Sequence, residues 1–162
     1  MTNDKIVPLE KLRQRTEDLR ASGKKLVATN GCFDLLHVGH TRYLRAAREL
    51  GDALVVGING DESVRELKGS GRPVNSANDR AEVVAALACV DLVTIFPDLR
   101  ATHFLETVAP DVYVKGGDYK ADTLDTDERN VLQRIGAKIE IVPFEQGYST
   151  SDLLARLGKR ER

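Results

Sequence analysis

The sequence predicts an α/β fold in which one five-stranded parallel sheet is doubly wound, with helices on both faces. Two observations lead to this prediction. Short apolar runs alternate with helical patterns five times along the 162 residues, and the second run, at 53–59, is apolar almost throughout. Such strands are typical of parallel sheets that are covered on both sides. No linker or repeat divides the chain, so we expect a single domain over 1–162.

The first residues of the chain predict a packing helix and then the first strand. Residues 8–22 are typical of a helix, because Pro8 occupies a first helical position and Gly23 follows its end. The apolar face of this helix carries Leu9, Leu12, Thr16 and Leu19. We expect residues 1–24 to cover one side of the first strand, which we place at 25–29.

Four further strands and their helices follow. The expected strands lie at 53–59, 92–96, 111–114 and 138–142. The expected helices lie at 38–50, 61–67, 77–88, 101–108, 125–135 and 149–157. Glycines end two of these helices, Gly51 the first and Gly136 the fifth, as is usual just beyond a helix. The basic residues at 158–162 are expected to form a solvated tail.

Composition and charge disfavour several classes of protein. The chain has 24 basic and 25 acidic residues and 5% aromatic residues, which is unlike a general nucleic-acid binder. No apolar run approaches the ~20 residues of a membrane span, and the polar start of the chain lacks a signal peptide. We therefore expect a cytoplasmic protein with no nucleic-acid or membrane partner. Cys32 and Cys89 have neither metal-ligand nor disulfide-framework spacing.

The stretch 29–40 predicts a phosphate-handling site. It joins the first strand to the start of the next helix, where free N–H groups and the helix dipole favour an anion. Gly39 lets a phosphate approach the main chain because it has no side chain. His37 and His40 flank this glycine and can donate hydrogen bonds to the same oxygens. Such donors stabilise charge during transfer, so we predict both histidines to be catalytic.

Three more polar loops are expected at the same edge of the sheet. Residues 68–75, 115–120 and 146–150 follow the second, fourth and fifth strands. Right-handed crossovers bring the carboxyl ends of parallel strands together, and ligands bind there at the reversal of strand order. The cationic and polar side chains expected to meet phosphate or sugar in these loops are Lys68, Arg72, Lys115, Asp118, Ser149 and Thr150.

Several of these residues have a plainer alternative. Asp34 is placed to bind Mg²⁺, to orient a histidine, or simply to cap a helix. Cys32 is expected to be a buried packing residue rather than a nucleophile. Loop 68–75 taken alone is typical of a flexible solvated loop, and 115–120 is typical of a plain turn. The histidine motif upstream and the nearby Arg80 favour a role in binding for loop 68–75.

The pattern Gly31-x-Phe33-Asp34-x-x-His37-x-Gly39-His40 resembles the HxGH signature of the cytidylyltransferase-like nucleotidyltransferases. The resemblance implies a Rossmann-like sheet of the HxGH type. It also implies an enzyme that transfers a nucleoside monophosphate from a nucleoside triphosphate to a phosphorylated acceptor and releases pyrophosphate.

Three further stretches, 67–75, 114–119 and 147–151, resemble one branch, the D-glycero-β-D-manno-heptose 1-phosphate adenylyltransferases or ADP-heptose synthase domains. The resemblance extends over residues 5–157. It implies ATP, Mg²⁺ and a sugar 1-phosphate as reactants, and a product used in the lipopolysaccharide core. Many members carry a fused sugar kinase, so we expect a stand-alone form served by a separate heptose kinase. Homodimers are common in this family.

The resemblance also assigns roles. It makes His37, His40 and Lys68 catalytic, the histidines on the ATP phosphates and the lysine at the transferred phosphate. The residues expected to bind nucleotide are Asn30, Gly31, Cys32, Phe33, Gly39, Arg80, Lys115, Gly117, Asp118, Ser149 and Thr150. Those expected to bind the acceptor are Asp34, Arg72, Asn75 and Tyr119. One departure is that no basic residue closely follows Ser149–Thr150, and the first is Arg156.

Two other functions are compatible with the same motifs. One is a cytidylyltransferase that acts on glycerol 3-phosphate or another phosphorylated acceptor. The other is a nucleotide-sensing module that binds ATP without turnover, which the intact His-x-Gly-His pair argues against.

Overall fold

The computed structural model, which describes residues 4–117, 124–143 and 147–158, has the predicted five-stranded parallel sheet. Its strands, in the spatial order β3-β2-β1-β4-β5, are β1 Leu26–Gly31, β2 Ala53–Asn59, β3 Leu92–Phe96, β4 Val112–Gly116 and β5 Lys138–Val142. The order reverses between β1 and β4, so a ligand site is expected beyond their carboxyl ends.

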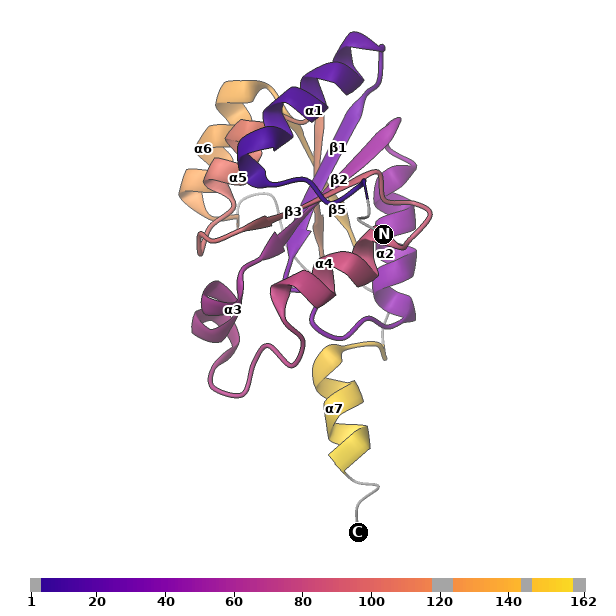
Figure 1. The fold of residues 1–162 in the computed structure, drawn as a ribbon, viewed down its shortest axis with the longest axis vertical. Helices are drawn as coiled ribbons and strands as arrows, with labels where there is room; N and C mark the ends of the chain where they lie inside the picture. Colours follow the sequence, from indigo (N-terminus) through magenta and orange to yellow (C-terminus); the bar gives the residue numbers. More distant parts are fainter. Residues whose placement is uncertain (1–3, 118–123, 144–146, 159–162) are drawn as a thin grey trace.

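Seven helices accompany the sheet in the described residues (Figure 1). They are α1 Leu9–Ala21, α2 Val38–Arg48, α3 Asp61–Lys68, α4 Ala77–Ala85, α5 Thr102–Val108, α6 Thr126–Ile135 and α7 Thr150–Gly158. Helices α2 and α4 cover one face, whereas α1, α5 and α6 cover the other. The predicted arrangement of helices on both faces is therefore confirmed.

Side chains alternate between the two hydrophobic cores along each central strand. The core under α2 and α4 contains Val27, Leu54, Val56, Val112 and Val114. The core under α1, α5 and α6 contains Ala28, Val55 and Tyr113. Because consecutive strand residues point to opposite faces, a strand buried on both sides must be apolar at nearly every position. This is why the run at 53–59 could be assigned to a central strand from the sequence.

The structure moves a few boundaries. Strand β1 extends past the expected end at residue 29, because Asn30 and Gly31 still pair with Gly57 and Ile58 of β2. Strand β4 extends to Gly116 by pairing with β5. Helix α4 ends at Ala85 rather than at residue 88, and Pro8 lies at the N-cap of α1 rather than in its first turn. The first residues of two expected loops are thus held rigidly at strand ends.

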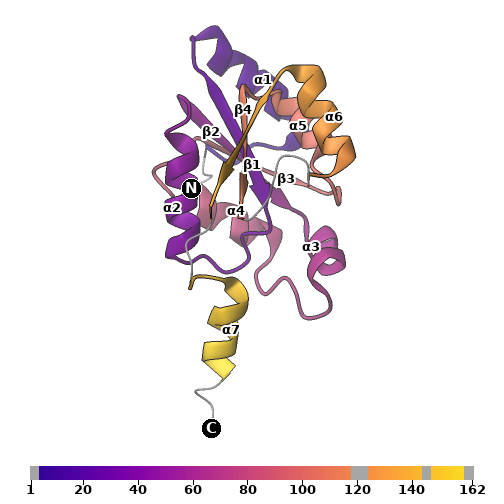
Figure 2. The same ribbon diagram turned by 180° about the vertical axis from the view of Figure 1, so that it is seen from behind.

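Helix α7 projects from the carboxyl end of the sheet, away from the body of the molecule (Figure 2). None of its described residues is buried. Gly158 is its last residue, and the other residues of the expected basic tail lie outside the described part of the chain. In that described part, no helix combines the length and the apolar character needed to cross a membrane.

Candidate active site

A cavity of about 820 Å³ lies beyond the carboxyl ends of β1 and β4. It brings together the three predicted catalytic residues, His37, His40 and Lys68. The other predicted site residues on its wall are Asn30, Gly31, Cys32, Phe33, Asp34, Gly39, Arg72, Lys115, Ser149 and Thr150. Gly117, Asn75 and Arg80 do not line it, whereas Asp118 and Tyr119 lie outside the described residues.

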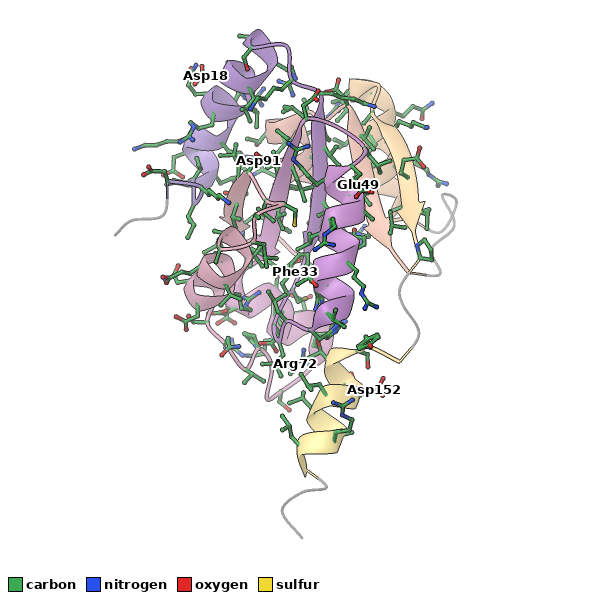
Figure 3. The ribbon with its side chains drawn as sticks, turned by 90° about the vertical axis from the view of Figure 1, so that its right-hand side faces the viewer. Asp18, Phe33, Glu49, Arg72, Asp91 and Asp152 are labelled. Atoms are coloured by element: carbon green, nitrogen blue, oxygen red, sulfur yellow. The ribbon has the colours of Figure 1, made fainter. Side chains whose placement is uncertain are left out.

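The side-chain view shows which end of the molecule carries the site (Figure 3). Phe33 and Arg72 lie toward the end from which α7 projects, and Asp18 of α1 lies toward the opposite end. Both Phe33 and Arg72 line the cavity. The site therefore lies at the end of the molecule from which α7 projects.

His37 and His40 form a close pair at the start of α2. Their ring centroids are 4.0 Å apart, and the ring of Phe33 lies 5.6 Å from that of His40. The backbone N–H of His37 donates a long hydrogen bond of 3.4 Å to His40 Nδ1. Because Nδ1 accepts, the neutral His40 ring carries its proton on Nε2, which makes Nε2–H the donor.

Both histidines are held in the neutral form. Burial, together with the neighbouring His37, lowers the pKa of His40 to about 4. Burial also lowers the pKa of His37. The Nδ1 atom of His37 is itself buried without a hydrogen-bond partner among the described residues. The pair can therefore offer N–H donors to an anion at neutral pH, but not two positive charges.

Gly39 lines the cavity, and its missing side chain makes room for the rings beside it. A Cβ atom at this position would lie 2.9 Å from His37 Nδ1 and 3.1 Å from Tyr148 Cβ. The space that a side chain at Gly39 would fill is therefore occupied by His37 and Tyr148, while Gly39 itself still lines the cavity. The missing side chain lets the His37 ring lie across the start of the helix, with Tyr148 packed beside it.

Replacing Gly39 by alanine is expected to displace the His37 ring while the fold is kept. The position is helical and buried, and the added methyl group must push the imidazole aside. Misplacement of a catalytic group can cost up to about 10²-fold, so we expect turnover to fall by about 10–100-fold. Turnover and urea unfolding should be compared with Gly158→Ala, where the added methyl group meets nothing within 4 Å. Unchanged turnover would contradict this role.

Asp34 fastens the loop after α3 to the start of the site. Its Oδ2 accepts from Arg72 Nε at 2.6 Å, and its Oδ1 accepts from the N–H groups of Val74 at 2.9 Å and Asn75 at 3.0 Å. The side chain of Asn75 returns a bond to the Asp34 carbonyl. Burial opposes ionisation of Asp34, but the bonds from Asn75, Val74 and Arg72 outweigh it and lower its pKa.

These contacts give Asp34 and Asn75 roles that differ from the predicted ones. Asp34 and Asn75 were expected to bind the acceptor, yet they hold each other and the loop 72–75. Arg72 keeps its predicted place on the cavity wall, fixed through Nε so that both Nη groups are left for a ligand. A fixed guanidinium is well suited to a phosphate.

Asp34 was the suggested ligand for magnesium. Among the described residues, no group of three or more His, Cys, Asp or Glu side chains is placed to hold a metal ion. Both carboxylate oxygens of Asp34, the suggested ligand, are already occupied by N–H donors. Asp34 does not cap a neighbouring helix either, because the N-caps of α2 and α4 are His37 and Ser76, so its contacts with loop 72–75 were not among the predicted roles.

Arg80 was expected to bind nucleotide, but the structure places it beneath the site. Its side chain is fully buried and does not line the cavity. The guanidinium donates to the carbonyl groups of Cys32, Asn59 and Asn75, and it pairs with Asp61 at 2.8 Å. Arg80 therefore ties together the ends of β1 and β2 and the start of α4. A buried arginine that satisfies several carbonyl groups cannot also meet a ligand.

Cys32 remains a packing residue. It is half-buried on the cavity wall, where burial raises the pKa of its thiol despite the nearby Lys68, Arg80 and Arg72. A protonated thiol is a poor nucleophile, so the structure agrees with the expectation that Cys32 is not one.

The start of α7 closes one side of the cavity. Ser149 Oγ accepts from Asp152 N–H at 3.0 Å, as expected for an N-cap. Thr150 Oγ1 donates a 3.4 Å bond to the carbonyl of Leu35, which links α7 to the loop after β1. Arg156 lies further along α7 and does not line the cavity.

One wall of the cavity contains none of the residues predicted from the sequence. This wall contains Leu99, Arg100, Leu124, Asp125 and Glu128. The first two residues follow β3, and the others lie at the start of α6. The rule that ligands meet the carboxyl ends of all strands would have indicated the segment after β3, but it contains no phosphate-binding motif.

Comparison with known families matches residues 28–156 to the family described as cytidylyltransferase-like. The chain is 43% identical over 155 residues to the bifunctional protein HldE of Syntrophotalea carbinolica, covering 96% of this chain and 31% of that protein. It is 46% identical over 153 residues to the bifunctional protein HldE of Geotalea uraniireducens, covering 94% of this chain and 31% of that protein. The chain thus spans about a third of the length of these curated relatives.

Solved structures give the same fold. One is the lipopolysaccharide core biosynthesis protein from Thermoplasma volcanium, with a TM-score of 0.63 and 28% identity over 78% of this chain and 100% of that one. Another is the pantoate-beta-alanine ligase from Francisella tularensis in complex with beta-gamma ATP and beta-alanine. It has a TM-score of 0.59 and 13% identity, covers 97% of this chain and 78% of the ligase, and supports the fold alone.

Proposed function

This chain belongs to the cytidylyltransferase-like family, and we propose that it transfers AMP from ATP to D-glycero-D-manno-heptose 1-phosphate, giving ADP-heptose and pyrophosphate. The observation that carries the proposal is the neutral His37–His40 pair at the start of α2, which shares one cavity with four cationic side chains, Lys68, Arg72, Arg100 and Lys115. The likeness to the HldE proteins over nearly the whole chain supports the choice of ATP and a heptose phosphate.

The reaction would be an in-line displacement at the α-phosphorus of ATP. A phosphate oxygen of the sugar 1-phosphate forms the new P–O bond, the bond to the bridging oxygen breaks, and pyrophosphate leaves. Positioning and charge stabilisation supply most of the catalysis in such a transfer. His40 Nε2–H would donate to a phosphate oxygen on which charge develops, while Lys68, Arg72 and Lys115 would neutralise the remaining charge.

Magnesium fits this proposal as part of the substrate. Because the described residues hold no carboxylate cage, ATP would enter as its magnesium complex. The sugar 1-phosphate would come from a phosphorylating reaction, and a homodimer remains an expectation drawn from the family resemblance. Asp118 and Tyr119, outside the described residues, keep their proposed roles toward nucleotide and acceptor.

The test is a pyrophosphate-release assay with Mg²⁺. The purified chain is given ATP, CTP or GTP in turn, each with heptose 1-phosphate and with glycerol 3-phosphate. We expect release with ATP and heptose 1-phosphate only. Release with CTP and glycerol 3-phosphate would contradict the proposed nucleotide and acceptor but would leave the proposed role of the histidines intact. Binding of ATP without release from any pair would favour the nucleotide-sensing alternative.

A further inference from the structure

A chain of polar contacts runs from α6 to the end of β1 along the cavity wall. Glu128 accepts from the N–H of Ala101 at 2.9 Å and lies 3.7 Å from Lys115 Nζ. Lys115 Nζ donates to Tyr113 Oη at 3.0 Å, and Tyr113 Oη donates to Asn30 Oδ1 at 2.6 Å. The chain of contacts thus joins β1, β4 and α6 at the point where the strand order reverses.

Tyr113 differs from the other members in its surroundings. Asn30, Lys115 and Glu128 line the cavity, whereas Tyr113 is fully buried and does not. Its ring belongs to the hydrophobic core under α1, α5 and α6. Any effect of Tyr113 on a ligand must therefore pass through the residues that its hydroxyl contacts.

The direction of these hydrogen bonds is fixed by chemistry. The ammonium group of Lys115 can only donate, so Tyr113 Oη accepts from it and keeps its own proton for Asn30. A hydroxyl that accepts from a cation is a stronger donor, in line with the short bond to Asn30 Oδ1. The buried carboxylate of Glu128 in turn holds the ammonium group in place.

We propose that Tyr113 is a positioning residue that orients the amide of Asn30 for nucleotide binding. Without a donor at Oδ1, the two ends of an asparagine amide can exchange places. With Oδ1 held by Tyr113, Nδ2 is the group left for a ligand, and no described residue accepts a hydrogen bond from it. The inference rests on the proposed function, because it makes an acceptor atom of ATP the partner of Asn30 Nδ2.

The first test is Tyr113→Phe, which keeps the ring in the core and removes only the hydroxyl. We expect the Kd for ATP, measured by calorimetry, and the KM for ATP to rise by about tenfold. The KM for heptose 1-phosphate should stay unchanged. Thr16→Val is the matched control, because it removes another buried hydroxyl, in α1, that does not line the cavity. Equal effects on both substrates would overturn the proposal.

A double-mutant cycle separates positioning from a merely structural role. If Tyr113 acts through Asn30, then Tyr113→Phe in an Asn30→Ala background should add less than about twofold to the Kd for ATP. Additive losses would overturn the inference. Failure of the proposed function is distinguishable, because it would appear as absence of pyrophosphate release by the wild-type chain. If the two losses of ATP affinity are additive while the wild-type chain releases pyrophosphate, only the proposed positioning role of Tyr113 is contradicted.

Discussion

Replacing His40 by alanine is expected to lower kcat by about 10²–10³-fold, the usual loss for one donor that stabilises charge in the transition state. The ring lies 4.0 Å from His37 on the cavity wall, and its Nε2–H is the donor left for a phosphate oxygen. Pyrophosphate release under saturating substrates is the measurement. The matched control is His103→Ala, which removes an exposed histidine outside the cavity and should leave kcat unchanged. Wild-type turnover in His40→Ala would contradict the catalytic assignment.

The same residue predicts a pH dependence of a particular sign. With a folded-state pKa of about 4 against an ordinary 6.5, His40 stays neutral between about pH 6 and 8. Its protonation should therefore not shape the activity profile there, whereas a catalytic imidazolium would make turnover rise as the pH falls. Between pH 6.5 and 4 the unfolded state binds the proton and the folded state does not, so stability falls as the pH falls. As the pH is lowered from 6.5 to 4, the midpoint of urea unfolding should fall less in His40→Ala than in the wild type.

Replacing Arg80 by methionine is expected to lower the free energy of unfolding by about 3–5 kcal/mol. The change leaves the carbonyl groups of Cys32, Asn59 and Asn75 without their buried donor. Breaking a buried charged network is among the few single changes of this size. Urea unfolding measures the loss, and Arg45→Met, at an exposed position of α2, is the matched control. Unchanged stability with weakened ATP binding would restore the predicted nucleotide contact for Arg80.

The sequence by itself determined the sheet and the location of the site. Three strands, at 53–59, 92–96 and 138–142, lie where they were predicted. This succeeds because burial on both faces demands nearly continuous apolar runs, which are visible in one dimension. The convergence of separated loops on one cavity also follows from sequence, since parallel strands connected by right-handed crossovers end at one edge. His37, His40 and Lys68 were placed together on that basis.

Only the tertiary structure decided what the polar residues of the site do. Arg80 and Cys32 are 48 residues apart, Asp34 and Asn75 are 41 apart, and Tyr113 and Asn30 are 83 apart. No local sequence pattern therefore predicts the hydrogen bonds between them. A cationic or acidic residue near a phosphate-binding motif can contact the ligand, or it can support the loop that contacts the ligand. The sequence alone does not distinguish these two roles. Which role it takes depends on burial and on the neighbouring carbonyl and N–H groups that need partners. Those neighbours exist only once the strands have been brought side by side.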